Sequence, residues 1–280
     1  MSERLSAIGA AGNRLAGELS GAGPACLAVH GLGDGSYVWR DLAGLVGDRR
    51  RLIRPDLRGH GDSDWVADAA YGVADHRADL LTLLEDLEVG SVVVIGHSLG
   101  ARLAIELALA RPDRVRGLCL LDYAPRANPA ALERLHGDLA AGFAGAYPTI
   151  ATYEAALLAR RPMLTAETAR WIAENALRLL PTGDYRLKTD PRVVASRGPG
   201  APSDAIETRL AAIRCPTLVV RGARSAMVSP LAMEATTAAI PGARSAVTPR
   251  AGHALLTENG AAVAALCEDF IAETLSRLPA

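Results

Sequence analysis

A serine flanked by glycines stands where a buried strand would give way to a helix. Residues Gly96–Gly100 read GHSLG, follow the apolar run Ser91–Ile95 and open the helix-period segment Ser98–Arg111. A tight turn there strains the serine and lifts its hydroxyl above the sheet, and the glycines remove side chains that would collide. The helix start favours negative charge beside it. We predict that Ser98 is a nucleophile; the alternative is a serine that only caps the helix.

A histidine late in the chain could activate this hydroxyl. A serine hydroxyl is a poor nucleophile until a base accepts its proton, and histidine has a pKa suited to that task near neutrality. His253 follows Gly252 in a polar loop between the last apolar run and the C-terminal helix, and we predict that it is the base. Other roles are expected for the remaining candidates: a structural turn for His60, packing for His97, and helix surfaces for His76 and His136.

A glycine-rich segment earlier in the chain could stabilise negative charge. Residues His30–Gly33 read HGLG and end the apolar run Ala25–His30. An acyl-transfer transition state places charge on the former carbonyl oxygen, and two preorganised backbone amides stabilise that charge. We assign these amides to Leu32 and Leu99. The alternative is a glycine-rich turn without a chemical role.

Short runs rich in Val, Ile and Leu must position these residues. They alternate with helix-period segments, which is typical of a parallel sheet covered on both faces. The candidate strands are Ala25–His30, Arg51–Arg54, Ser91–Ile95, Val115–Leu121, Thr217–Arg221 and Ser245–Val247, preceded by an antiparallel hairpin of Leu5–Ile8 and Arg14–Leu19. The main helices are expected over His76–Glu88, with Asp75 as its N-cap, over Ser98–Arg111 and over Ala262–Leu278.

The alternation breaks between about residues 125 and 214. This stretch has no strand-like run, and the helix-period segments Tyr153–Arg160 and Ala166–Leu180 dominate it. A Gly/Pro/Ser-rich piece, Ser196–Ser203, follows. We therefore predict a helical insertion within the series of strands and helices.

The motifs HGLG, DLRGHGDS, GHSLG and a late GH occur in this order at the ends of the candidate strands. In these features the chain resembles the α/β-hydrolase superfamily, specifically its cap-bearing, esterase-like members, over essentially its whole length. The resemblance implies a mostly parallel eight-stranded sheet with helices on both faces, a helical cap inserted after the sixth strand, and a Ser–acid–His triad. The core would span residues 1–124 and 214–280, and the cap residues 125–213.

The chain departs from the family pattern at the triad acid. The family usually places this acid after the strand that follows the cap, but Ser225 stands there, and no Asp or Glu occurs between residues 214 and 234. Some members of the family place the acid after the strand that follows the nucleophile helix. Asp122 occupies that position here.

Asp122 is therefore the predicted acid. A carboxylate there would hold the imidazole in the tautomer whose free nitrogen faces Ser98, and would stabilise the imidazolium that forms. The alternative is that Asp122 only caps a loop and that Asp204 or Glu207, near the end of the insertion, supplies the acid.

A serine nucleophile leaves acyl transfer as the leading chemistry and disfavours mechanisms that need an aspartate to form an alkyl-enzyme ester. The expected substrate is a small to medium carboxylic ester, thioester or lactone, cleaved through an acyl-enzyme at Ser98, and no cofactor or metal is required. Hydrolysis of a carbon–carbon bond, or a lyase or cyclisation step, is the alternative within the same fold. A ligand-binding protein that retains the triad is the alternative outside the enzymes.

The aromatic residues suggest where a pocket lies. Only 4% of the chain is aromatic, and these side chains fall mainly in loops after strands and in the insertion. We place the pocket between the loop of Tyr123 and the cap, with Tyr123 and Trp171 as candidate lining residues; parallel sheets also exclude aromatics by default. Solvated helix faces explain the basic residues of the cap more simply than an anionic substrate does. These are Arg160, Arg161, Arg170, Arg178, Arg186 and Lys188.

The composition disfavours several classes of binding partner. The 280 residues are 50% hydrophobic, and 30 Lys+Arg balance 31 Asp+Glu, so neither a disordered chain nor binding to nucleic acid or an anionic membrane is favoured. We expect a small-molecule substrate and a monomer or homodimer. The cysteines lie far apart and predict free buried thiols in a reducing compartment. With neither a leader-like N-terminus nor a membrane-length apolar run, a cytoplasmic location is expected.

Overall fold

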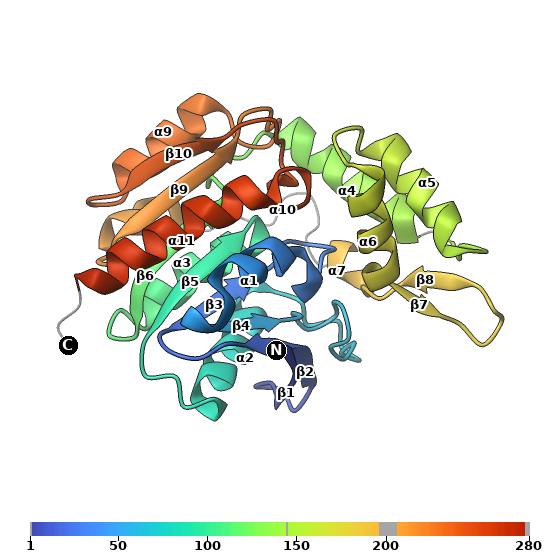
Figure 1. The fold of residues 1–280 in the computed structure, drawn as a ribbon, viewed down its shortest axis with the longest axis horizontal. Coiled ribbons are helices and arrows are strands. Elements are labelled where there is room, and N and C mark those ends of the chain that lie inside the picture. Colours follow the sequence, from blue (N-terminus) through green and yellow to red (C-terminus); the bar gives the residue numbers. More distant parts are fainter. Residues whose placement is uncertain (1, 144, 196–205, 278–280) are drawn as a thin grey trace.

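A computed structural model describes residues 2–143, 145–195 and 206–277, and within them eight strands form one central sheet (Figure 1). The strand order is β1-β2-β4-β3-β5-β6-β9-β10. Only the pairings of β2 with β1 and β4 are antiparallel among these described strands. The bounds are β1 Ser2–Ile8, β2 Arg14–Ser20, β3 Ala25–Val29, β4 Arg51–Pro55, β5 Val92–His97, β6 Val115–Leu121, β9 Thr217–Gly222 and β10 Arg244–Thr248.

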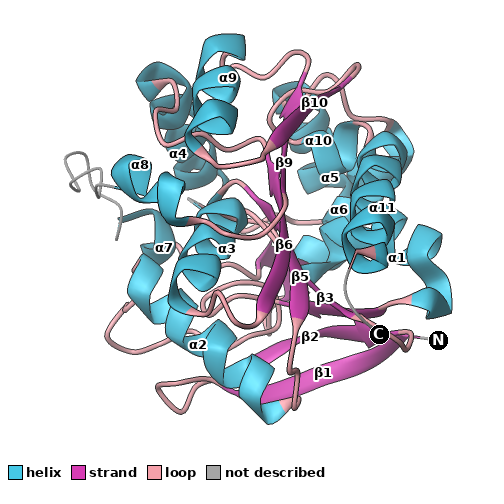
Figure 2. Cartoon of the chain, turned by 90° about the vertical axis from the view of Figure 1, so that its left-hand side faces the viewer, coloured by secondary structure: helices cyan, strands magenta, loops and turns pink. Residues whose placement is uncertain are grey.

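Helices cover both faces of this sheet, as predicted. On one face lie α2 (Val73–Asp86), α3 (Leu99–Ala110) and α9 (Pro230–Ala239); on the other lie α1 (Arg40–Val46) and α11 (Gly260–Ser276) (Figure 2). Side chains of successive strand residues point to opposite faces, so a strand covered on both sides is apolar throughout. Within β5, Val92 and Val94 join one buried apolar cluster, and Val93 and Ile95 join the other.

Helix α2 differs from its prediction at its start. Its N-cap is Gly72 and not Asp75, because the helix begins earlier and Asp75 acts from the third helical position. There the Asp75 carboxylate accepts the Gly72 N–H at 2.9 Å. His76, predicted on the surface, is 1% exposed. It is buried because the ring stacks on Tyr71, with 6.5 Å between the ring centroids.

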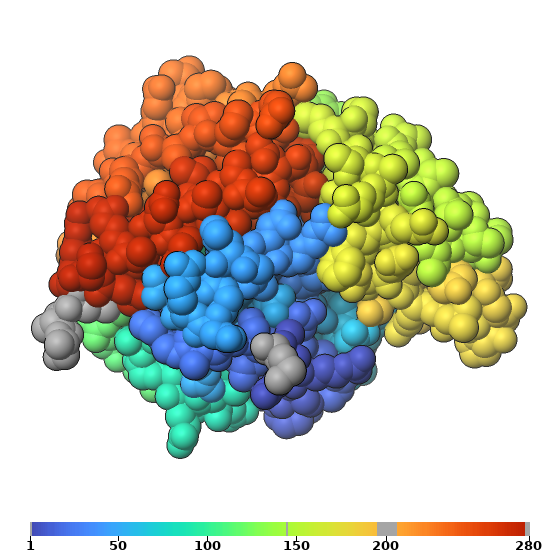
Figure 3. All heavy atoms as spheres, in the orientation of Figure 1, coloured from blue at the N-terminus to red at the C-terminus, as the bar shows by residue number. Residues whose placement is uncertain are grey.

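The chain between β6 and β9 forms the region predicted to be a cap, at one end of the sheet (Figure 1). It contains α4 (Pro129–Phe143), α5 (Ile150–Arg160), α6 (Ala166–Ala176), α7 (Arg192–Ala195) and α8 (Ile206–Arg209). In the space-filling view its side chains pack against both the N-terminal and the C-terminal parts of the core (Figure 3). The predicted segment Ser196–Ser203 lies outside the described residues.

The prediction that the insertion has no strand was wrong. Strands β7 (Leu177–Leu179) and β8 (Tyr185–Leu187) form a two-stranded antiparallel sheet, so the predicted helix Ala166–Leu180 ends at Ala176. Gly183, with a φ of 91°, turns the chain between the strands. The strands are three residues each, too short for an alternating pattern to stand out from a helical one.

The smaller elements complete the core. They are the 3-10 turns η1 (Ser36–Trp39), η2 (Gly47–Arg49) and η3 (Leu210–Ala212) and the short helix α10 (Leu255–Glu258). Cys26, Cys119 and Cys267 are buried free thiols as expected, whereas Cys215 is only partly buried. In the part of the chain that the structure covers, no helix is both long and apolar enough to cross a membrane.

Gly100 is expected to tolerate no side chain. A Cβ at this position would lie well inside contact distance of the Val29 carbonyl oxygen, which is backbone and cannot move aside. We expect Gly100→Ala to lower the free energy of unfolding by about 3 kcal/mol. Gly44→Ala is the matched control, because no atom lies within 4 Å of its Cβ position and α1 should gain about 0.5–1 kcal/mol. Urea unfolding measures both; equal midpoints for the two variants would contradict this.

Candidate active site

Ser98 occupies a strained turn between β5 and α3. Its φ is 52° and its ψ is −112°, in a region that residues with side chains rarely adopt. The turn is too tight for a side chain at Gly96, whose Cβ would collide with the Gly100 carbonyl. The Ser98 N–H donates to the Leu121 carbonyl at 3.0 Å, which fixes the turn against β6. The hydroxyl therefore stands at the end of the sheet.

The structure brings Ser98, His253 and Asp122 into one hydrogen-bonded line. His253 Nε2 lies 3.2 Å from Ser98 Oγ, and His253 Nδ1 lies 2.8 Å from Asp122 Oδ2. The Asp122 side chain is fully buried, while that of His253 is 19% exposed. A proton on Nδ1 thus faces the carboxylate, and the free electron pair on Nε2 faces the hydroxyl.

Asp204 and Glu207, the alternative acids, are not found beside His253 in the described part of the chain. Asp204 lies outside the described residues. Glu207, on α8, pairs with Arg126 at 2.9 Å on the surface. Among the described candidates Asp122 is thus the carboxylate that reaches His253.

The Asp122 carboxylate is held from several sides. Its Oδ1 accepts the Gly222 N–H at 2.9 Å, and its Oδ2 accepts both the Ser225 hydroxyl at 2.5 Å and the His253 ring. The Asp122 N–H donates to the Val220 carbonyl at 2.7 Å. Apart from His253, these partners come from β9 and the loop after it, which is the segment where the sequence lacks the usual acid. The orientation of the carboxylate is therefore fixed by the neighbouring strand.

The loops of Leu32 and Leu99 pack against each other. A Cβ on Gly31 would lie 2.8 Å from the His97 ring, so HGLG lies directly on the turn of the serine. Leu99 is the first residue of α3, and its N–H therefore has no acceptor within the helix. Leu32 lies in a turn closed by the Asp34 N–H and the Gly31 carbonyl at 3.3 Å. This arrangement is compatible with the predicted pair of amides.

Two buried histidines, His30 and His97, support these loops. The sequence predicted a packing role for His97 and no role for the His30 side chain. His97 Nε2 lies 2.8 Å from the His253 carbonyl oxygen and donates to it, which ties the two loops together. His30 Nε2 accepts the Leu57 N–H at 2.9 Å, so its Nδ1–H donates to the Gly31 carbonyl at 2.7 Å. His60, as expected, lies in a turn, where its N–H donates to the Leu57 carbonyl. The sequence signal that could have pointed to His30 is its place as the first residue of the HGLG motif.

His30 and His97 should make the fold sensitive to acid. The pKa of each is lowered from 6.5 to about 4, by burial in both cases and, for His97, also by the nearby His253. Between these values the unfolded chain binds protons that the native chain does not. The free energy of unfolding should therefore fall as pH falls from about 6.5 to about 4, by up to about 3 kcal/mol per histidine.

Urea unfolding at a series of pH values measures this slope. His97→Gln keeps an N–H donor near the His253 carbonyl but cannot titrate, so it should remove part of the slope. A slope unchanged in this variant would show that His97 is not one of the groups responsible.

The region predicted to be a cap contacts the loops of Leu32 and His253. Leu139, on α4, packs against Gly33, and the methyl group of Met163, between α5 and α6, packs against Gly252. Neither residue was singled out from the sequence, because apolar residues of a helical insertion carry no signal of which face meets the core. They place the cap over the loops that contain the predicted oxyanion residue Leu32 and His253.

The predicted lining residues Tyr123 and Trp171 lie in different apolar clusters. Tyr123 packs with the aliphatic residues on the α3 side of the sheet. Trp171 packs on the other side and lines a cavity of about 170 Å³ between α6 and the core. Glu258 also lines this cavity; its carboxylate accepts the Gly252 N–H at 2.5 Å, and burial raises its pKa. Glu258 thus holds the loop of His253, and the role of both aromatics in substrate binding stays a prediction.

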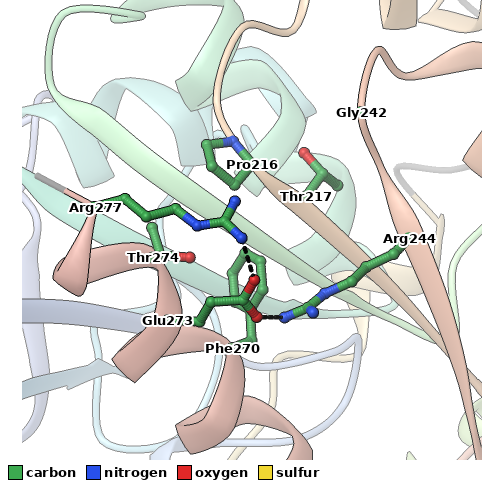
Figure 4. Close-up of a pocket in the computed structure, with 8 residues that line it drawn as sticks. All are labelled: Pro216, Thr217, Gly242, Arg244, Phe270, Glu273, Thr274 and Arg277. Atoms are coloured by element: carbon green, nitrogen blue, oxygen red, sulfur yellow. Dashed lines mark hydrogen bonds and ion pairs between the residues drawn. The ribbon is translucent and has the colours of Figure 1, made fainter.

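Another cavity, of about 240 Å³, lies away from this site, near the beginnings of β9 and β10 (Figure 4). Figure 4 shows the Glu273 carboxylate between the guanidinium groups of Arg244 and Arg277, and both pairs are in contact. None of the predicted site residues lines it among those described. The residues predicted to be catalytic lie instead at the carboxyl ends of the strands.

Several basic residues of the cap have partners within the chain. The guanidinium groups of Arg178 and Arg186 lie 4.3 and 4.7 Å from the centre of the Trp65 ring. Lys188 pairs with Asp62 at 3.0 Å. These side chains stabilise the contact between the cap hairpin and the core, so they are not simply solvated helix faces.

Comparisons with known proteins agree with this architecture. A family model described as the alpha/beta hydrolase fold matches residues 24–260. The chain belongs to the α/β-hydrolase fold family. It is 32% identical to 2-(acetamidomethylene)succinate hydrolase of Mesorhizobium japonicum over 83% of this chain and 82% of that protein. Relatives that match over most of the chain are named as hydrolases, and this α/β-hydrolase is one as well.

Solved structures of hydrolases superpose on this α/β-hydrolase. The crystal structure of E-2-(acetamidomethylene)succinate hydrolase matches with a TM-score of 0.85 and 28% identity, over 96% of this chain and all of that chain. A thermophilic esterase from Thermogutta terrifontis matches with a TM-score of 0.77 and 27% identity, over 97% and 99% of the two chains. The fold predicted from the motifs is thus confirmed.

Proposed function

We propose that this α/β-hydrolase is a serine hydrolase that cleaves a small to medium carboxylic ester, thioester or lactone through an acyl-enzyme at Ser98. The observation that carries the proposal is the line of hydrogen bonds from Ser98 through His253 to Asp122. A binding protein would have no need for a strained serine with its hydroxyl against an imidazole, since backbone strain costs stability.

The proposed reaction has two halves. Ser98 Oγ attacks the carbonyl carbon while His253 Nε2 accepts the hydroxyl proton, and the carbonyl oxygen becomes an oxyanion near the N–H groups of Leu32 and Leu99. The intermediate collapses, the bond to the leaving group breaks, and His253 returns the proton to that group. Water then attacks the acyl-enzyme with His253 as base, and the acid leaves. Asp122 stabilises the imidazolium in both halves.

A related substrate class has its own support. The relative of 32% identity is named for hydrolysis of 2-(acetamidomethylene)succinate, and its similarity extends over most of both chains. That compound carries an acylated nitrogen, so an amide of this kind is a second candidate substrate for the same Ser98 chemistry. Carbon–carbon bond hydrolysis and lyase or cyclase steps are distinguished from it by product analysis.

Covalent labelling tests the proposal without knowledge of the substrate. A fluorophosphonate should add to the peptide that contains Ser98, as seen by mass spectrometry, and should abolish turnover in parallel. Turnover is then measured on p-nitrophenyl esters graded by chain length, on a thioester, on a lactone and on 2-(acetamidomethylene)succinate. Folded protein that is neither labelled at Ser98 nor active on any of these would favour a ligand-binding role and contradict the proposal.

A further inference from the structure

Ser225 occupies the place where the family pattern has its acid, and it contacts the acid that this chain uses instead. Its hydroxyl lies 2.5 Å from Asp122 Oδ2, the same oxygen that faces His253 Nδ1 at 2.8 Å. Ser225 is 7% exposed and Asp122 1% exposed, so water does not compete freely for this oxygen.

The direction of the Ser225 hydroxyl follows from its other partners. Its Oγ accepts the N–H groups of Met227 at 3.2 Å and Val228 at 3.1 Å. A hydroxyl has two lone pairs and one proton. With both lone pairs facing N–H donors, the proton is left for the Asp122 carboxylate. The hydroxyl is therefore a fixed donor.

A buried arginine holds the loop that carries this hydroxyl. The Arg221 guanidinium donates to the carbonyl oxygens of Val228 at 2.6 Å and of Ala223 and Ser225 at 3.2 Å each. Arg221 lies at the end of β9 and is 9% exposed. A guanidinium presents its donors in a rigid fork, so these bonds fix the shape of residues 223–228. The position of Ser225 is thus imposed by the loop.

We propose that Ser225 is a positioning residue that, through its hydroxyl, orients the Asp122 carboxylate and sets the pH at which His253 becomes a base. This inference rests on the proposed function. The donor draws negative charge away from the oxygen that faces His253, so the imidazolium is stabilised less and the free base persists to lower pH. It also holds the carboxylate in the plane that His253 Nδ1 requires.

Other charged groups face the same pair and are unchanged by a substitution at Ser225. The His97 ring, from β5, lies 5.0 Å from that of His253. Burial raises the pKa of Glu258, on α10, while the Gly252 N–H, Arg161 and His253 act in the opposite direction and Asp122 adds to the rise. Asp34 faces the His97 ring, with 3.8 Å between Asp34 Oδ2 and His97 Nδ1. A change in half-maximal pH on removal of the Ser225 hydroxyl is therefore attributable to its bond to Asp122, whereas loss of its bonds to the Met227 and Val228 N–H groups should lower the melting temperature.

The test is the rate of inactivation by a fluorophosphonate as a function of pH. We expect Ser225→Ala to react about tenfold more slowly and to reach half-maximal reactivity at a pH about half a unit or more higher. Ser225→Thr, which keeps the hydroxyl, should recover both. Ser229→Ala is the matched control, because its hydroxyl accepts the Ala232 N–H at the start of α9 and does not contact Asp122. Should Ser225→Ala not fold, Ser225→Cys, a weak donor, carries the same expectation.

Three outcomes overturn the inference. If the wild type reacts and Ser225→Ala matches it in rate and half-maximal pH, Ser225 does not act on His253 and the proposed function stands. If Ser225→Ala is slower and melts at a lower temperature but keeps the wild-type half-maximal pH, its role is only structural. If the folded wild type does not react at all, the proposed function fails and this inference fails with it.

Discussion

Replacing Ser98 by glycine should abolish turnover and at the same time stabilise the fold. The hydroxyl is the proposed nucleophile, so kcat should fall about 10⁶-fold. The backbone at Ser98 has a φ of 52° and a ψ of −112°, and glycine adopts such angles without the strain that a Cβ brings. Removing this strain should raise the free energy of unfolding by about 1 kcal/mol. The Ser98→Gly variant should therefore lose its activity and gain stability at the same time.

Two measurements check this pair of effects. Ester turnover by Ser98→Gly should fall to the background rate, while its midpoint in urea should rise. Ser98→Ala is the control: it also removes the hydroxyl but keeps the Cβ, so it should be equally inactive without the gain in stability. A Ser98→Gly variant that loses stability would show that the turn is not strained.

The Asp122→Asn variant should lose about 10⁴-fold in kcat/KM while remaining folded. The amide oxygen would keep the bond to the Gly222 N–H, so the amide nitrogen would face His253 Nδ1. Nδ1 must then accept a hydrogen bond, which moves the ring proton to Nε2. An Nε2–H cannot accept the proton of Ser98. The wrong tautomer therefore stops the reaction.

Asparagine is the most informative substitution at position 122, because it fits the backbone conformation there. Asp122 has a φ of 46°, and asparagine tolerates this left-handed region better than most residues. The backbone should therefore not be strained, but an amide N–H group of the new asparagine facing the Ser225 hydroxyl sets one donor against another, so the melting temperature should fall modestly while the protein stays folded. A kcat/KM within tenfold of wild type would remove Asp122 from its proposed role.

A rescue experiment uses the neighbouring serine. Ser225 Oγ and His253 Nδ1 contact the same Asp122 oxygen, so a carboxylate at position 225 could enter the space that Asp122→Ala vacates. We expect Ser225→Asp in the Asp122→Ala background to recover part of the lost activity. In the wild-type background the same substitution should be harmful, because two carboxylates at this distance cannot both ionise.

Local patterns allowed most of the core to be predicted. The apolar runs that became β3 to β6 and β9 were found within about two residues of their ends, since burial on both faces of a parallel sheet leaves a continuous apolar run; β10 was found as closely, although it is an edge strand and most of its residues are not buried. The hairpin of β7 and β8, in contrast, was mistaken for the end of a helix. Its short strands pair with each other outside the main sheet, so neither burial nor length marks them.

Burial of single polar residues was harder to foresee. His76 stands four residues before Leu80, so it continues the leucine face of α2, and its ring is enclosed by Tyr71 and by His60, with 6.2 Å between the centroids of the two histidine rings. Those partners come from a loop whose path is not encoded in the helix itself. The helical period thus places His76 on the buried face, whereas its polar residue type favoured the surface.

The sequence by itself determined the fold family, the positions of Ser98 and His253 in it, and the absence of the usual acid after the cap. These follow from contiguous residues: the strand, turn and helix around Ser98 are encoded within residues 92–110. Only the tertiary structure decided which carboxylate meets His253, because the two residues are 131 positions apart and follow β6 and β10, two strands separated in the sheet by β9. It also decided that Ser225 donates to that carboxylate, since a partner across two loops depends on strand order and register, which no local pattern contains.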